Sequence, residues 1–377
     1  MIRRLVPLLA LPFLAANALA QGHGMPQPVD RPTGAPENRA LVDSLSARLS
    51  AEYVFPEVAA AMVKSLKAGR NRYEKITSSI DLANTLTDDL EAISHDKHLR
   101  IVYREQEIAE RNGEEFSPGD IAAHRKESRI RNHGFEKIER MMGNVGYLEM
   151  RSFAEPANGA AETATAAMNF LGNVDALIID LRRNGGGSPD MVALVTSYLY
   201  GAGERVHLND LYWRSGDRTE QFWTVPSVTG PRLDGKDVYI LTSSFTFSAA
   251  EEFCYNLKNL ERATLVGDTT GGGAHPGALV RLADHFEMFC PTGRAINPIS
   301  KTNWEGTGVT PDMPCPADDA LTLAHVTAIE KLLTRADDPD DRQRLTMALD
   351  RVKADAVAPT GDTAPPGGPA RIIVRGN

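Results

Sequence analysis

Two continuous apolar runs, each followed by a turn and a helical pattern, constrain the fold of this chain most. They read VDALIIDL at residues 174–181 and DVYILTS at 237–243. A strand without polar alternation is covered on both faces, which is typical of a parallel sheet flanked by helices. ATLVG at 263–267 and VGYLEM at 145–150 continue the pattern. Strands that alternate with helices predict an α/β fold from about residue 144.

The first third of the chain has a different pattern. Leu41, Leu45 and Leu49 recur at four-residue spacing, and two further amphipathic runs follow before residue 94. This periodicity predicts a small helical bundle. The expected organisation is a signal peptide at 1–20, a flexible linker at 21–37, an N-terminal helical domain at 38–95, an α/β core at 96–335 that includes a charged excursion or lid at 104–141, and a polar helix followed by a disordered tail at 336–377.

The first twenty residues predict a secreted or periplasmic protein. Arg3 and Arg4 precede a short apolar run that ends on Ala18-Leu19-Ala20, small residues of the kind found at a signal peptidase site. The alternative is a retained membrane anchor. The net charge is −9, and no basic stripe accompanies it, which argues against nucleic acid as a partner.

The chain has three cysteines, an odd number that cannot all pair within one molecule. Cys290 and Cys315 flank one segment, and a disulfide between them is one possibility in an oxidising compartment. Three free buried thiols are the alternative. Cys254 falls on a predicted helix, where we expect it to be a small buried apolar residue. No CxxC spacing indicates a metal site.

The segment LTSSFTFSAAEEF at 241–253 places Ser248 between a buried strand and a helix. A serine there lies at the carboxyl edge of the sheet, where N–H groups of the first helical turn favour negative charge. Acyl transfer needs such a hydroxyl and such donors. On this segment alone the favoured interpretation is a helix N-cap, because serine is very common at that position. The run NGGG at 184–187 ends the neighbouring strand, where exposed N–H groups could face a ligand.

A nucleophilic serine needs a base. The segment SHDKHLRIVY offers His95 and His98, and NPISKTNWEGTGVTPD offers Glu305 in a glycine-rich loop. A carboxylate of this kind can orient an imidazole. Sequence spacing alone does not show whether these residues converge.

The order of several segments resembles the S41 serine peptidases, in particular the branch that contains the tricorn core protease and the interphotoreceptor retinoid-binding protein modules. These segments are SHDKHL, GYLEMRSF, DLRRNGGG, LTSSFTFSAAEEF, LVGDTTGGG and NPISKTNWEGTGVTPD, and the resemblance covers roughly residues 40–330. It implies a crotonase-like (ClpP/crotonase-type) α/β peptidase core with a small N-terminal helical bundle. It also implies Ser248 as nucleophile, His98 as general base and Glu305 as the residue that orients His98.

The same resemblance implies that the backbone N–H of Ala249 and that of Gly185 or Gly186 form the oxyanion hole. Two departures are visible. The glycine-rich loop GDTTGGGAHPG lacks the lysine of the serine–lysine tail-specific branch, Lys258 is a poor substitute within a helix, and no PDZ-like stretch is found. Lys97 stands where the tricorn protease has a serine beside its histidine, which leaves open how Glu305 contacts His98.

The sequence therefore predicts a serine-type peptidase that works through an acyl-enzyme, without a metal or other cofactor. The expected partner is a peptide or unfolded protein substrate. The alternative is a catalytically weak or inactive S41-like module that binds an apolar ligand such as a retinoid or lipid. An acyl-CoA enzyme on the same core is a third possibility, but no basic cluster for the nucleotide stands out.

Overall fold

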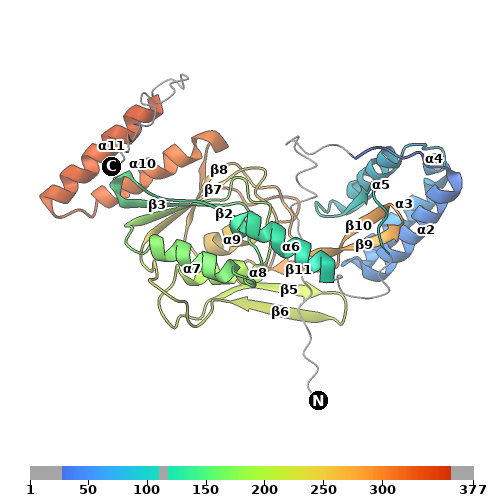
Figure 1. Cartoon of the computed structure of the whole chain (residues 1–377), viewed down its shortest axis with the longest axis horizontal. Coiled ribbons are helices and arrows are strands. Elements are labelled where there is room, and N and C mark those ends of the chain that lie inside the picture. The colour runs from blue at the N-terminus through green and yellow to red at the C-terminus, as the bar shows by residue number, and fades with distance from the viewer. Residues whose placement is uncertain (1–27, 110–117, 358–377) are drawn as a thin grey trace, which may run out of the picture.

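A six-stranded sheet in the order β12-β8-β7-β4-β3-β2 lies at the middle of the molecule (Figure 1). The computed structural model describes residues 28–109 and 118–357. All neighbouring strands are parallel except β2, which is antiparallel to β3. The strands are β2 Phe135–Met141, β3 Val145–Met150, β4 Ala176–Asp180, β7 Asp237–Thr242, β8 Thr264–Gly267 and β12 Met313–Pro314. The predicted α/β fold is confirmed.

Helices cover both faces of this sheet, which explains its continuous apolar strands. On β4, Leu177 and Ile179 pack into the cluster formed with α7, α8 and α9, whereas Ile178 packs into the cluster formed with α10 and α11. Successive side chains of a strand point to opposite faces, so both faces must be apolar. The helices are α7 Ala160–Phe170, α8 Pro189–Ser197, α9 Ala249–Asn259, α10 Ala320–Leu333 and α11 Pro339–Val357.

The N-terminal helices form a second hydrophobic cluster, at the opposite end of the molecule from α11 (Figure 1). They pack on a three-stranded sheet in the order β1-β10-β9, whose strands include Ile101, Leu282 and Met288 in the same cluster. The elements are α2 Ala35–Glu52, α3 Pro56–Ala68, α4 Arg70–Tyr73, α5 Ser79–Ser94, β1 Arg100–Tyr103, β9 Gly277–Ala283 and β10 Phe286–Pro291. The helical bundle is confirmed, but strands from the expected α/β core range complete its hydrophobic core.

A third sheet, in the order β11-β5-β6, lies beside the central one and packs with helix α9 through β5. Its strands are β5 His207–Trp213, β6 Arg218–Trp223 and β11 Gly293–Ile296. Helix α6 Pro118–Ile130 precedes β2. Helix α6 and strand β2 both fall within the predicted charged excursion at 104–141. Its last part is an edge strand of the central sheet, because β2 pairs with β3 over the whole strand.

The disulfide between Cys290 and Cys315 is not formed, and all three cysteines are free. Cys290 packs in the N-terminal cluster, whereas Cys315 packs beside the cluster of α10 and α11, so the two thiols belong to different parts of the fold. The predicted signal peptide at 1–20 and the tail beyond 357 lie outside the described residues. Among the helices of the described ranges, none has the length and hydrophobicity needed to cross a membrane.

Candidate active site

Ser248 lies immediately before α9, at the carboxyl edge of the central strand β7. Its backbone has φ 55° and ψ −123°, a conformation that costs free energy for any residue with a Cβ atom. The Ser248 N–H donates to Glu251 Oε2 at 2.9 Å, and this bond helps to hold the unusual turn. Strain that the surroundings maintain is concentrated at functional sites. Ser248 is the N-cap residue of α9, and its bond with Glu251 is one half of a capping box, but its positive φ differs from the extended backbone of an ordinary N-cap residue.

The glycine run after β4 lies directly against this turn. A Cβ atom on Gly186 would come within 2.8 Å of Ser248 Cβ and 3.0 Å of the Ala249 nitrogen. The backbone φ of Gly186, +111°, also requires glycine. The Gly186 N–H already donates to Asn184 Oδ1 at 2.9 Å. Phe247 N–H donates to the Asn184 carbonyl at 3.1 Å and ties the two segments together. The backbone at Gly186 therefore lies against the N-terminus of α9.

Glu251 connects the serine turn to the glycine-rich loop at 268–276. Its buried carboxylate accepts hydrogen bonds from Thr270 Oγ1 at 2.5 Å, from Gly272 N–H at 2.7 Å and from Gly273 N–H at 2.8 Å. Burial raises the pKa of Glu251 to about 7, although these donors and the Ser248 N–H oppose the rise. This residue is not among the predicted site residues, and its place in the Ala-Ala-Glu-Glu run was the only signal for it.

His98 follows α5, and its ring packs beside the turn that carries Ser248. Its ring centroid is 4.6 Å from that of Phe247, the residue before Ser248, and 5.6 Å from that of Phe289. Burial lowers the pKa of His98 to about 3, with the Asp96 carboxylate opposing this shift. The imidazole is therefore neutral at physiological pH, which is the form that a general base needs, although a pKa this low makes the resting ring a weak base. His95, the other candidate, is exposed and ends α5 in the left-handed conformation.

Glu305 reaches the His98 segment from the loop that precedes β12. Its Oε1 accepts the Lys97 N–H at 2.9 Å, and its Oε2 accepts the Ala274 N–H at 2.5 Å. A carboxylate oxygen of Glu305 lies within 4.8 Å of a ring nitrogen of His98. The Lys97 side chain points elsewhere and pairs with Glu91 at 2.5 Å. Lys97 therefore contributes its backbone N–H to the site, and its side chain does not separate Glu305 from His98.

Two further residues, Asp96 and His275, belong to this cluster and are not among the predicted site residues. Asp96 Oδ1 accepts a hydrogen bond from the backbone N–H of His98 at 3.0 Å. Its Oδ2 accepts one from the Tyr53 hydroxyl at 3.0 Å. His275 Nδ1 lies 2.8 Å from Asp96 Oδ2 and 3.4 Å from Glu305 Oε2. Both residues stand in the motifs SHDKHL and GGGAHPG, but nothing in the spacing links two positions 179 residues apart.

The charges of this cluster influence one another. Burial and the Asp96 charge raise the pKa of Glu305 to about 7, against the opposing effects of His275 and two backbone N–H groups. Burial would raise the pKa of Asp96, but the hydrogen bonds and charges of His275 and His98 together outweigh burial and lower it. Burial would lower the pKa of His275, but its bond to Asp96 and the two carboxylate charges raise it.

Asp96, His98 and Glu305 are close enough for a cation to bridge them, since their ligand atoms lie within 4.8 Å of one another. Both carboxylates, however, already accept several hydrogen bonds each, from backbone N–H groups and from Tyr53 or His275. A cation would have to replace these donors. The two carboxylates instead hold the backbone of the Lys97–His98 segment and the His275 ring by hydrogen bonds.

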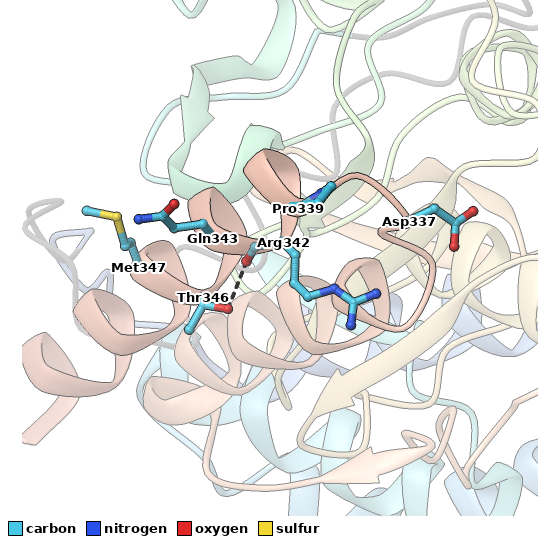
Figure 2. A pocket seen from close by; sticks show the side chains of 6 residues that line it. All are labelled: Asp337, Pro339, Arg342, Gln343, Thr346 and Met347. Atoms are coloured by element: carbon cyan, nitrogen blue, oxygen red, sulfur yellow. Dashed lines mark hydrogen bonds between the residues drawn. The ribbon is translucent and has the colours of Figure 1, made fainter.

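A surface hollow lies elsewhere, on helix α11 and the connection that precedes it (Figure 2). It is lined by Asp337, Pro339, Arg342, Gln343, Thr346 and Met347. None of these residues belongs to an element that carries Ser248, His98 or Glu305. The hollow is therefore separate from the candidate active site.

In this α/β fold the His98 ring packs on Phe247, the residue before Ser248, and a Glu305 oxygen lies within 4.8 Å of a His98 ring nitrogen. A family model described as peptidase family S41 matches residues 144–315. A second model, described as the N-terminal domain of S41 peptidases in eukaryotic interphotoreceptor retinoid-binding protein, matches residues 36–132. These matches together span most of the chain, and the chain belongs to peptidase family S41.

Curated relatives match a shorter part of the chain. The carboxy-terminal-processing protease of Bartonella bacilliformis is 26% identical over 177 residues, which are 46% of this chain and 39% of that protein. The chloroplastic carboxyl-terminal-processing peptidase 2 of Arabidopsis thaliana is 26% identical over 179 residues, 46% of this chain and 32% of that protein. The match thus spans less than half the length of these relatives.

Solved structures show the same fold at low sequence identity. The tricorn protease has a TM-score of 0.51 and 13% identity over 85% of this chain and 37% of that chain. A lipoprotein from Streptococcus agalactiae has the same TM-score and identity over 82% of this chain and 99% of that chain. The fold predicted from the sequence, an S41 peptidase core with a helical N-terminal region, is confirmed.

Proposed function

We propose that this chain is a serine-type peptidase that uses Ser248 as nucleophile, His98 as general base and Glu305 to orient His98. The observation that supports this most is the meeting of three distant segments. His98 packs against Phe247, beside the strained Ser248, while a ring nitrogen lies within 4.8 Å of a Glu305 oxygen. Family membership makes a peptide bond the natural substrate class.

In the proposed reaction, Ser248 Oγ attacks the carbonyl carbon and its proton passes to the neutral His98 ring. The N–H groups of Ala249 and of Gly185 or Gly186 stabilise the oxyanion. The proton then moves from His98 to the leaving amine, and an acyl-enzyme remains. Water, deprotonated by His98, hydrolyses the ester and releases Ser248. Since Gly186 already bonds Asn184, Gly185 is the favoured second donor.

The test is cleavage of an unstructured peptide library by the protein without residues 1–20. We expect wild type and Ser244→Ala to cleave, because Ser244 is an exposed serine near the turn. Ser248→Ala should lose at least about three orders of magnitude in rate. Equal cleavage by Ser248→Ala would refute the assignment. A wild type that is inert but retains an apolar ligand on purification would favour the binding module instead.

We also propose that residues 1–20 direct secretion, so that the peptidase acts in the periplasm or outside the cell. The residue pattern supports this proposal, and the described structure does not include the segment. Cell fractionation with N-terminal sequencing tests it. The expected result is an exported protein whose chain begins at Gln21. A cytoplasmic protein that retains Met1 would contradict it.

A further inference from the structure

Asp96 and Glu305 bring two carboxylates together in the protein interior. The Asp96 side chain is fully buried and the Glu305 side chain is 13% exposed. Their ligand atoms lie within 4.8 Å of each other. Two negative charges at this separation repel strongly away from water. The fold therefore needs a positive charge here, or one of the carboxyl groups must take up a proton.

His275 lies where that positive charge is needed. Its Nδ1 is 2.8 Å from Asp96 Oδ2 and 3.4 Å from Glu305 Oε2, so a single N–H faces both carboxylates. The ring is only 7% exposed and packs edge-on against Phe55 at a centroid distance of 5.3 Å. This contact holds the imidazole in one orientation toward the two acids.

The groups around His275 come from several elements. Asp96 and His98 come from the segment after α5, Glu305 from the loop before β12 and Tyr53 from the end of α2. Arg294 on β11 adds a positive charge that opposes protonation of His275. Of the charged groups that affect His275, the two carboxylates favour its cationic form, and they outweigh burial and Arg294.

We propose that His275 is a positioning residue of this site, whose imidazolium binds Asp96 and Glu305 together, favours the ionised form of Glu305 and holds Glu305 beside His98. The inference rests on the proposed peptidase function. A protonated Glu305 could not stabilise the positive charge that His98 acquires during acylation. His275 thus couples the glycine-rich loop to the general base without touching the substrate.

The first test is the pH dependence of inactivation by a fluorophosphonate, measured as a rate from pH 5 to 9. In wild type the rate should rise as Glu305 ionises, near its pKa of about 7. His275→Gln removes a neighbouring positive charge and should move this rise upward by about one pH unit. Asp96→Asn removes a negative charge and should move it downward. His207→Gln is the control, because His207 pairs with Asp210 outside the site.

A purely structural role would lower the rate by the same factor at every pH and leave the rise where it is. That result, or shifts of the same sign in His275→Gln and Asp96→Asn, would overturn the inference. If wild type does not react with the fluorophosphonate at all, the proposed function fails first, and the second test decides on His275 by itself.

The second test is a titration of the histidines by ¹⁵N NMR in Ser248→Ala, which needs no activity and no change at His275. His275 should titrate above the ordinary histidine pKa of about 6.5. Its pKa should fall when Asp96→Asn or Glu305→Gln is added to this background. A His275 that titrates at or below the ordinary value in Ser248→Ala would overturn the inference.

Discussion

The backbone of Ser248 is the most informative single-residue feature of the molecule. A positive φ with ψ near −123° is held by the Glu251 carboxylate on one side and by the close approach of Gly186 on the other. Neither contact depends on a substrate. The turn is therefore formed before catalysis, and the serine and its N–H neighbours need no rearrangement to meet a carbonyl group.

Burial of Glu252, the next carboxyl group on α9, makes the stability of the fold depend on pH. Burial raises its pKa to about 8, with the Asp190 charge adding to the rise and Asn209 and Asn256 opposing it. Between about pH 4.5 and 8 the folded chain therefore holds a proton that the unfolded chain releases. The contribution of Glu252 to the free energy of unfolding is present at low pH and is lost as the pH rises.

We therefore predict that the free energy of unfolding of Glu252→Gln, relative to that of wild type, is higher at pH 8 than at pH 5 by on the order of 3 kcal/mol. Urea unfolding at the two pH values measures this. Glu136→Gln, on the exposed side of β2, should show no such dependence. A difference between Glu252→Gln and wild type that is the same at pH 5 and pH 8 would contradict the predicted protonation.

The residues that the sequence predicts and those it misses differ in one respect. Ser248 could be predicted because a buried strand, a turn and a helix are local patterns. His98 and Glu305 were identified from the resemblance of their motifs to a family. Asp96 and His275 carry no local signal, because their roles exist only when the chain brings positions 179 residues apart within hydrogen-bonding distance.

At the scale of elements, the glycine-rich loop at 268–276 has little room for change. It passes between α9 and the 304–308 segment, and Trp304 Nε1 donates to the Gly273 carbonyl at 2.7 Å. A Cβ atom on Gly273 would lie 2.6 Å from His98 Cε1 and 2.2 Å from the Phe247 ring. The loop therefore fixes the position of His98 by direct packing.

Gly273→Ala should displace His98 and reduce peptide cleavage by about 100-fold or more, because small misplacements of a catalytic group are costly. Overpacking should also destabilise the fold by about 1–3 kcal/mol. Cleavage rates and urea unfolding measure the two effects. Gly34→Ala is the control, since its added methyl group meets only Pro36, at 4.0 Å. Wild-type cleavage by Gly273→Ala would contradict this packing.

Elements could be predicted from the sequence where their burial produces a regular pattern of apolar residues, and not where this pattern is missing. The continuous apolar runs of β4 and β7 predict strands in the interior of the sheet. In contrast, β2 alternates little and exposes most of its side chains, because it lies at the edge of the sheet, so it was predicted as part of a charged excursion. The pairing of β1 with β10 depends on partners nearly 190 residues apart, which no local period encodes.

At the scale of the whole molecule, the candidate site lies where two parts of the chain meet. His98, Asp96 and Tyr53 belong to the range matched by the N-terminal model, whereas Ser248 and Glu305 belong to the range matched by the S41 model. The hairpin of β9 and β10 belongs to the second range but packs in the N-terminal cluster. Neither part holds the complete set of residues, so we expect the N-terminal region to be required for activity.

Mass-spectrometric mapping of a fluorophosphonate adduct on wild type and His98→Gln tests directly whether Ser248 is the nucleophile. We predict one adduct, on Ser248, in the wild type, and loss of most of the labelling in His98→Gln, because Ser248 depends on His98 for its activation. An adduct on another serine, or undiminished labelling of Ser248 in His98→Gln, would contradict it.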